Sequence, residues 1–447
     1  MTDMLETLTT RLLEAAKRAG AGAADAVAID QSATGIDIRG GKLEQAERSE
    51  AVEVGLRVLV GQRQACVSVS DLSEASFAMA AERAVAMARE APEDPHAGLA
   101  DPSQLARDWD LAALELADAT PEPSPSELED DARQVEAAAM ARAGIVQVEA
   151  SASYSRRSVH LAGTNGFSGG YARTSRSVSA VAFTGEGLGM ERDWAAESRI
   201  FQRDLPGARG VGELAAERAL ERLGARRPKT GAYPVLFDER IAAGLIGHLL
   251  QAVNGASVAR GAGWLRDRLG EQVLPKGLSV IEDQRRPRAT ASRPFDAEGL
   301  PSRQREIVTD GVLNGWTLDL ATARKLGMAS TASASRGPTA PPSPASSNID
   351  LTQGTATLAE LIAQMGTGLL ITSMIGASIN GTTGDYSRGA SGFWVENGEI
   401  TYPVNELTIA GNLRDMLMRI TPANDARMHL STRVPSLLVE GLTLAGS

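Results

Sequence analysis

The spacing of apolar residues predicts a helix followed by strands at the start of the chain. Leucines recur at helical spacing within residues 4–18, which is the pattern of an amphipathic helix. Residues 26–29 form a short apolar run, and residues 52–60 alternate between apolar and other side chains, as in a strand with one buried face. A turn and the following residues 63–69 complete a predicted hairpin.

Capping and turn patterns predict the next elements. Asp71 and Glu74 form a pattern similar to a capping box, ahead of an Ala-rich helix that reaches residue 90. The Asn165-Gly166 dipeptide predicts a hairpin turn within the β-rich residues 148–183. Two more helices are expected, at residues 126–143 and 213–223.

The second half has fewer predicted helices and many short strands punctuated by glycine. Helices are expected at residues 239–253 and 358–365, whereas the Ser-, Ala- and Pro-rich residues 330–347 favour a loop. The order of elements indicates an α+β fold rather than a strictly alternating one. We expect two domains, an N-terminal α+β domain with antiparallel strands at residues 1–228 and a C-terminal domain at residues 229–447.

The net charge of −11 is concentrated in one Pro-rich segment. Residues 91–131 contain twelve acidic residues and one basic residue, a balance of 1 − 12 = −11, so the rest of the chain is neutral. We expect this segment to be irregular, with at most a short helix within residues 104–117, and we favour a solvated connection over a docking surface. The acidic balance argues against a protein that neutralises nucleic acid phosphates.

Several other protein classes are excluded by the composition. With 43% hydrophobic and 23% charged residues, the chain is not a disordered protein, and with Cys66 as the single cysteine it is not a disulfide scaffold. The first residues lack a basic segment followed by a long apolar run, and the apolar residues 368–379 are too few for a spanning helix, which needs about 20. We therefore expect a cytoplasmic protein that binds neither membrane nor nucleic acid.

Motifs for hydrolysis and metal binding are weak when taken alone. Ser168 lies in a G-x-S-x-G match, but it follows a turn and precedes strand-like residues, so a glycine-rich hairpin is favoured over a nucleophile elbow. No two of the four histidines lie within one helical turn. We favour His248, on a predicted apolar helix, as a core or interface residue rather than a metal ligand.

The densest polar cluster lies within the glycine-rich residues 380–394. Its glycines allow close backbone approach, and the charges of Asp385 and Arg388 could pair. Two interpretations stay open, a loop that lines a cleft and a tight turn followed by a strand. As peptide-cleft candidates we single out five consecutive residues: Asp385, Tyr386, Ser387, Arg388 and Gly389.

Several motifs in order resemble the TldD/PmbA family. The strongest are Gly384-Asp385-Tyr386-Ser387-Arg388-Gly389-Ala390, residues 392–400 and residues 408–413, with further matches at residues 189–193, 292–299 and 323–327. The resemblance covers nearly the full chain and is strongest after about residue 230. It implies an N-terminal α+β domain and a β-rich, barrel-like C-terminal domain.

The resemblance also implies a role in peptide hydrolysis. Family members form a cytoplasmic metallopeptidase from two kinds of chain that acts on unfolded peptides, with zinc held by a TldD-like subunit. There the zinc site rests on an H-E-x-x-x-H helix and a distant cysteine. This chain is expected to bind a TldD-like partner, as a heterodimer or a higher assembly, and unfolded peptides.

The zinc motif is degenerate at the corresponding positions of this chain. On the helix expected at residues 245–255, the ligand positions become Leu250 and Gly255, and the position of the catalytic glutamate becomes Gln251. Placing His248 on the first ligand instead puts Leu249 where the glutamate should be. Zinc hydrolysis needs three ligands and a carboxylate base. We therefore expect no catalytic residue, no metal and no cofactor in this chain, and zinc in the partner.

Two alternatives remain beside the zinc-free subunit. One is a stand-alone homodimer that binds peptides or regulates another protein, and the other is a hydrolase of unrecognised mechanism. Residues 332–338 also differ from the family pattern, which there contains His and Gly. If that segment shapes a substrate cleft, the peptide contacts of this chain differ as well.

Overall fold

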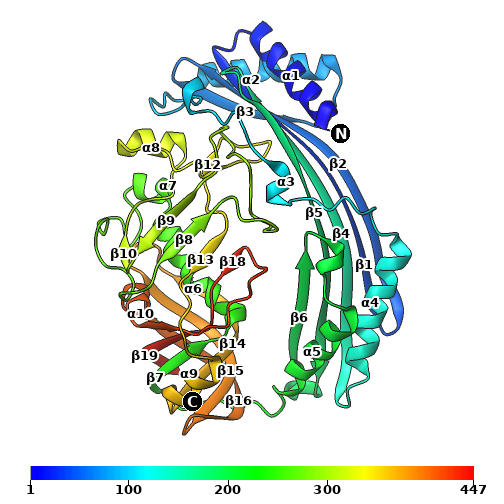
Figure 1. The fold of residues 1–447 in the computed structure, drawn as a ribbon, viewed down its shortest axis with the longest axis vertical. Coiled ribbons are helices and arrows are strands. Elements are labelled where there is room, and N and C mark those ends of the chain that lie inside the picture. Colours follow the sequence, from blue (N-terminus) through cyan, green and yellow to red (C-terminus); the bar gives the residue numbers. More distant parts are fainter. Residues whose placement is uncertain (1, 447) are drawn as a thin grey trace.

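A long curved sheet and a C-terminal region beside it make up the molecule, in a computed structural model that describes residues 2–446 apart from the side chains of Thr2 and Ala377 (Figure 1). The long sheet has the order β3-β2-β1-β4-β5-β6, with every neighbouring pair antiparallel. Its strands are β1 Ala23–Arg39, β2 Lys42–Val60, β3 Arg63–Val69, β4 Ile145–Gly163, β5 Ser168–Thr184 and β6 Glu191–Arg199. Because β2 and β4 have 19 residues each, they extend about 60 Å, and the sheet arches along the molecule.

Two pairs of helices cover one face of the long sheet at its two ends. Helices α1 (Thr2–Arg18) and α2 (Glu74–Glu90) pack over one end, and α4 (Pro125–Met140) and α5 (Ala208–Leu220) over the other. Strand β1 contributes to both cores, because its even-numbered side chains all lie on the face of the sheet that carries the helices. It contributes alanines 24, 26 and 28 to the first core and isoleucines 36 and 38 to the second.

The predicted elements of this half are confirmed in type but differ in extent and capping. The strand expected at residues 52–60 begins earlier, since β2 spans Lys42–Val60. The strand expected at residues 26–29 extends over Ala23–Arg39 because β1 pairs along its length with β2 and β4. The capping box on Asp71 is wrong, since Ser73 is the N-cap of α2 and Asp71 instead accepts a hydrogen bond from the Ser73 amide. Ser168 begins β5 after the Asn165-Gly166 turn, which confirms the hairpin.

A five-stranded barrel forms the centre of the C-terminal region. Strands β16, β15, β14, β7 and β19 pair in that order, and β16 also pairs with β19, which closes the ring. The strands are β7 Gly231–Phe237, β14 Gly368–Ile379, β15 Asp385–Glu396, β16 Glu399–Asn412 and β19 Leu437–Ala445, with β17 Ile420–Pro422 added to β19. Helix α6 (Glu239–Ala252) packs on one side of the strands and α9 (Leu358–Met365) on the other. The expected α+β fold with a barrel-like C-terminal part is confirmed.

Shorter elements surround the barrel. A small sheet has the order β10-β9-β8-β13-β18, and residues 330–347, expected to be a loop, contain two strands of two residues each. The small sheet consists of β8 Val280–Asp283, β9 Gln304–Thr309, β10 Val312–Leu313, β13 Ile349–Leu351 and β18 Thr432–Arg433. The other short elements are α3 Leu111–Leu114, α7 Gly255–Ala259, α8 Leu320–Leu326, α10 Leu413–Leu417, β11 Ala334–Ser335, β12 Ser343–Pro344, η1 Pro102–Gln104, η2 Gly187–Gly189 and η3 Gln202–Asp204. No helix within residues 2–446 has the length and apolar character needed to span a membrane.

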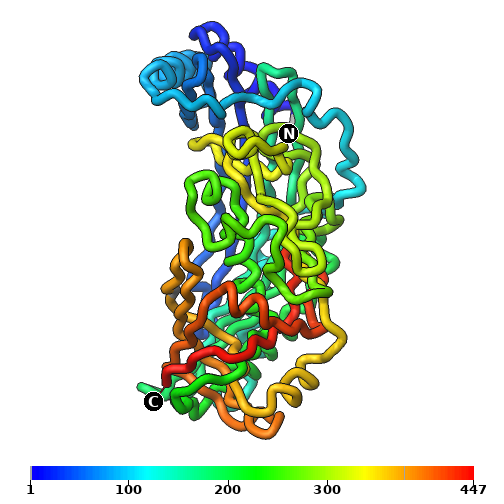
Figure 2. Tube along the Cα trace, turned by 90° about the vertical axis from the view of Figure 1, so that its left-hand side faces the viewer, coloured from blue at the N-terminus to red at the C-terminus, as the bar shows by residue number. Residues whose placement is uncertain are grey.

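The acidic segment 91–131 leads from α2 to α4 and also contacts the C-terminal region, while most of its acidic side chains are exposed, as expected of a solvated connection. Its Trp109 packs edge-on against Phe295 of the C-terminal region, with ring centroids 5.0 Å apart. Glu115 forms an ion pair with Arg288 at 2.8 Å. In Figure 2 the cyan chain of this segment runs down beside the yellow-green C-terminal chain. Trp109 and Glu115 therefore attach the segment to the C-terminal region, contacts that composition alone does not reveal.

A buried carboxylate links the long sheet to the C-terminal region. Asp25 of β1 accepts hydrogen bonds from Arg57 of β2, one of them at 2.9 Å, and from Arg336 of the 330–347 segment. The side chains of Asp25, Arg57 and Arg336 are 7%, 4% and 1% exposed. Burial alone would raise the pKa of Asp25, but the two guanidinium groups outweigh burial and hold its pKa below the usual value. We call these three residues the Asp25 clamp.

The Asp25 clamp predicts a large effect of Asp25→Asn on stability. The substitution leaves two guanidinium groups buried without their counter-charge, and breaking a buried ion pair in this way costs about 3–5 kcal/mol. Urea titration should show that loss in the free energy of unfolding. The matched variant Asp30→Asn, at a partly exposed position of the same strand, should change it little. Equal stabilities of the two variants would contradict the clamp.

Candidate functional site

The structure brings together the two groups of candidate residues that the sequence places far apart. Helix α6 begins at its N-cap Asp238 and buries Leu245 and Leu249 in the barrel core. This orientation places the His248 ring against Tyr386 of β15, with centroids 5.8 Å apart and ring planes at 71°. The degenerate zinc-motif helix and the polar strand therefore form one site.

Both rings at this site are uncharged at neutral pH. Burial, reinforced by the positive charge of Arg388, lowers the pKa of His248 below its ordinary value, and the nearby Gln251 side chain partly opposes this. Burial raises the pKa of Tyr386 to about 12. The His248 Nδ1 atom is buried and has no hydrogen-bond partner among the described residues. A single neutral imidazole can exchange hydrogen bonds with a ligand, but here it has no carboxylate beside it.

Asp385 and Arg388 do not pair with each other, although their charges suggested it. Positions three apart on a strand face opposite sides. Asp385 accepts hydrogen bonds from Thr383 at 2.7 Å and Asn412 at 3.1 Å, and these contacts lower its pKa. The Nε atom of Arg388 donates to the Gly376 carbonyl at 2.7 Å. The cluster is thus a turn that continues into a strand of the barrel.

The remaining candidates, Ser387 and Gly389, lie where β15 pairs with its neighbouring strands. Ser387 lies opposite Ser378 of β14 and Ala410 of β16. Gly389 lies opposite Thr408, and a Cβ atom there would lie only 2.7 Å from Ile375 Cγ2. Glycine is therefore required for close approach of β14. Of the five residues, Tyr386 and Arg388 are the two that act on His248.

The helix predicted to reach Gly255 ends earlier, which separates the former ligand positions. Helix α6 ends at Ala252, and Gly255 is the first residue of α7 after the N-cap Asn254. Leu250 packs against the barrel core, and Gln251 is exposed. A Cβ atom on Gly255 would lie 2.5 Å from Leu318 Cδ2 and 2.7 Å from the Thr317 carbonyl oxygen. We call Thr317 and Leu318 the wall at Gly255. No side chain fits at position 255 without displacing this wall.

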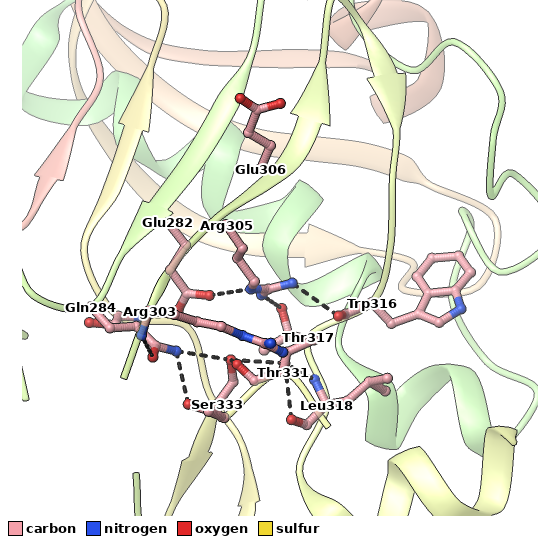
Figure 3. Close-up of polar contacts among 12 residues, drawn as sticks. Glu282, Gln284, Arg303, Arg305, Glu306, Trp316, Thr317, Leu318, Thr331 and Ser333 are labelled. Carbon is pink, nitrogen blue, oxygen red and sulfur yellow. Dashed lines mark hydrogen bonds and ion pairs between the residues drawn. The ribbon is translucent and has the colours of Figure 1, made fainter. Parts of the chain in front are cut away.

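A buried polar network holds the wall in place (Figure 3). Arg305 of β9 forms an ion pair with Glu282 of β8 at 2.6 Å, and it also donates to the Trp316 carbonyl at 3.0 Å and to Thr317 Oγ1 at 2.7 Å. The Glu282 side chain is fully buried. Because a buried charge must keep its partner, residues 316–317 are fixed relative to the small sheet, and so is the contact with Gly255.

The same network anchors the start of the 330–347 segment. Gln284 donates to the Ala332 carbonyl at 2.9 Å and accepts from the Arg303 amide at 3.0 Å. Thr331 Oγ1 accepts from the Leu318 amide at 2.8 Å. This network was not predicted from the sequence. The available indication was the charged Glu282 directly after the apolar Val280-Ile281, with the neutral Gln284 two residues later.

The residues at this site do not fit a zinc ion. Residues 2–446 contain no group of three or more His, Cys, Asp or Glu side chains arranged to hold a metal. Leu250 and Gly255 offer no ligand atom from their side chains, and the wall at Leu318 leaves no room for a longer one. Cys66 lies on β3 of the long sheet, where burial raises its thiol pKa.

The Arg388 charge predicts a measurable shift in the titration of His248. In the unchanged protein we expect the His248 imidazole to titrate below its ordinary pKa of 6.5 and to be neutral at pH 7. Arg388→Gln removes a like charge, so the pKa of His248 should rise toward the ordinary value. NMR titration of the four histidines measures this directly. Arg18→Gln, on α1, should leave the His248 curve unchanged, and an equal shift in both variants would contradict the assignment.

The wall at Gly255 predicts opposite effects for two Gly→Ala substitutions. Gly255→Ala forces a methyl group against Leu318 and should lower the free energy of unfolding by about 1–3 kcal/mol. Gly244→Ala, on the exposed side of α6 with no atom within 4 Å of the added carbon, should raise it by up to about 1 kcal/mol. Urea titration distinguishes the signs. A higher free energy of unfolding in Gly255→Ala would show that Leu318 and Thr317 can move aside, and it would contradict the prediction.

Family models match three parts of the chain. They are described as PmbA/TldA metallopeptidase domain 1 at residues 24–88, the central domain at residues 118–223 and the C-terminal domain at residues 230–446. The motif resemblance in the sequence is thereby confirmed.

Curated relatives and solved structures agree with these matches. The chain is 37% identical to metalloprotease PmbA of Escherichia coli O157:H7, over 99% of this chain and 96% of the relative. It is 36% identical to a PmbA homologue of Haemophilus influenzae, over 97% and 94%. A Bacteroides thetaiotaomicron crystal structure, whose description names a candidate modulator of DNA gyrase, matches with a TM-score of 0.91 and 26% identity over 99% and 98%.

An archaeal structure shows the same fold at greater distance. TldE from Thermococcus kodakarensis matches with a TM-score of 0.85 and 18% identity, covering 98% of this chain and 99% of that one. Three domain models in order, and more than a third of residues shared with PmbA over almost the full length, leave one assignment. This chain belongs to the PmbA/TldD metallopeptidase family.

Proposed function

We propose that this chain is a PmbA-type (TldE-type) subunit of a cytoplasmic metallopeptidase complex that cleaves unfolded peptides, and that it holds no zinc itself. In this proposal a TldD-like partner supplies the zinc and the activated water. The PmbA-type chain contributes the neutral site around His248 and Tyr386 and the surfaces that enclose the peptide. Similarity to PmbA over the full length supports the assignment to this type of subunit.

The contact at Gly255 is the observation that carries the proposal. Two of the family ligand positions fall on Leu250 and Gly255, and the second lies against Leu318 and Thr317, which the Glu282–Arg305 pair holds in place. Gln251, at the position of the catalytic glutamate, is exposed and cannot act as a carboxylate base. Supplying metal chemistry from a second chain is therefore the consistent arrangement.

The peptide-cleft role of Tyr386 and Arg388 is part of the same proposal. Arg388 is partly exposed beside the neutral His248, so it can receive a backbone carbonyl or a carboxylate of a peptide. Tyr386 is buried and supports the ring of His248. In this proposal Arg388 contacts the peptide, Tyr386 acts through His248, and neither residue cleaves the peptide.

Metal analysis and reconstitution test the proposal together. We expect the purified chain to contain no stoichiometric zinc and to leave a disordered test peptide intact. Addition of a TldD-like chain from the same organism should produce chelator-sensitive cleavage, and that partner carrying a substituted zinc ligand should produce none.

Three outcomes would contradict the proposal. Tightly bound zinc in the isolated chain, lost in His248→Ala, would show a metal site within it. Chelator-resistant cleavage by the isolated chain would show an independent hydrolase. A stable homodimer that binds peptides and ignores the TldD-like chain would instead support a stand-alone binding protein.

A further inference from the structure

A cavity lies between the long sheet and the C-terminal region, away from the site around His248. Its volume is about 370 Å³, within the range of small-ligand pockets. Strands β1, β4 and β5 line one side through the face that α1 and α2 leave uncovered. Residues 290–297, 334–336 and 345–347 line the other side. The Asp25 clamp, through Arg336, lies at its border.

The charged groups at this cavity are mostly arginines, in a chain whose net charge is −11. Four arginines line it, together with a single carboxylate, that of Asp296: Arg157, Arg173, Arg293 and Arg336. The Asp296 carboxylate already accepts hydrogen bonds from three backbone amides, at 2.9, 3.0 and 3.0 Å. The Asp296 oxygens are therefore already occupied by backbone N–H groups. One carboxylate also cannot balance the positive charge of four arginines.

Two of these arginines have buried N–H groups without a protein partner. The Arg336 side chain is 1% exposed; its Nη1 donates to Asp25, while Nη2 has no partner among the described residues. Arg293 donates from Nη1 to the Ala334 carbonyl at 2.9 Å, while its Nε is likewise unpartnered. Buried charged donors are costly unless a hydrogen bond satisfies them. Both arginines line the same cavity, so it presents two cationic groups whose hydrogen bonds are incomplete.

The rest of the lining is mainly apolar and aromatic, with Thr290 and three serines, Ser335, Ser346 and Ser347, among it. Val27, Val159 and Leu161 come from the strands, and Phe295 comes from the opposite side. Phe295 is itself fixed by edge contacts with Trp109 and Tyr171, with ring centroids 5.0 and 5.6 Å away. The apolar part of this lining favours a ligand that carries an apolar group over a fully hydrated anion such as inorganic phosphate. Planar guanidinium groups match a planar carboxylate in geometry.

We propose that this cavity binds a small organic carboxylate that carries an apolar group, with the carboxylate held by Arg336 and Arg293 and the apolar group against Phe295 and the strands. The carboxylate could belong to a free acid or to the carboxyl terminus of a peptide, and the chemistry of recognition is the same. The inference rests on this chain alone and does not depend on a zinc-binding partner.

Calorimetric titration of the full chain tests the ligand class. N-acetyl-leucine should bind saturably in the millimolar range or tighter, whereas N-acetyl-leucinamide and inorganic phosphate should not. A leucine-terminated tripeptide with a free carboxyl terminus, compared with its amidated form, identifies a peptide as the second source. Equal binding of acid and amide, or no binding of any carboxylate, would overturn the proposal.

Paired variants test the location. Arg157→Gln removes a positive charge at the exposed border of the cavity and should weaken N-acetyl-leucine binding about tenfold. Arg156→Gln, the exposed neighbour that points to the other face of β4, should leave it unchanged. Similar losses in both variants would place the ligand elsewhere.

A third variant addresses the unpartnered donor itself. Arg336→Lys keeps a positive charge beside Asp25 and removes Nη2, so binding should fall tenfold or more in a protein whose folding is checked by circular dichroism. Unchanged binding in folded Arg336→Lys would overturn the role of Arg336. If this variant does not fold, the comparison of Arg157→Gln with Arg156→Gln decides the location.

Discussion

The carboxylate of Asp25 is shared by two arginines, and the placement of the two halves of the molecule depends on this interaction. A charge this deeply buried is tolerated only when its partners are held in position, so Arg57 and Arg336 cannot drift apart without a large cost. The clamp brings the backbone at Pro338 so close to β2 that a Cβ atom on Gly55 would overlap it. Arg336, held by the clamp, also lines the cavity between the two halves.

A second buried pair organises the C-terminal region in the same manner. Arg305 and Glu282 fix residues 316–317. Gln284 fixes the beginning of the 330–347 segment, which carries Arg336 of the Asp25 clamp. The wall against Gly255 and the position of Arg336 therefore depend on connected polar networks.

Elements with clear periodicity were predictable from the sequence, whereas long-range charge contacts were not. Alternation identified β2, and leucine spacing identified α1, because each pattern reports one buried face. The length of β1 was underestimated, because residues 30–35 are small or polar and interrupt the apolar pattern before Ile36 and Ile38 resume it. Asp25 and Arg336 are 311 positions apart, and no local pattern connects them.

The candidate site around His248 was likewise predictable only in part, because some of its contacts are long-range. The resemblance pointed to Leu250, Gln251 and Gly255 on one helix, whereas the apolar spacing had already ended that helix at residue 253, close to the observed end at Ala252. The proximity of His248 to Tyr386 depends on how α6 packs on the barrel, which is a property of the assembled core. The acidic segment was located correctly by charge counting, but its ion pairs require partners from distant elements.

Closure of the barrel also restricts where an extended chain can be captured. A peptide that joins a sheet needs a strand with an unpaired edge, and each of the five barrel strands already has two neighbours. The long sheet, in contrast, ends in β3 and β6. Strand β6 carries several charged residues, which discourage edge pairing, whereas β3 carries one, Arg63. Of these two edge strands, the less charged is β3, which lies near the top of the molecule beneath α1 and α2 (Figure 1).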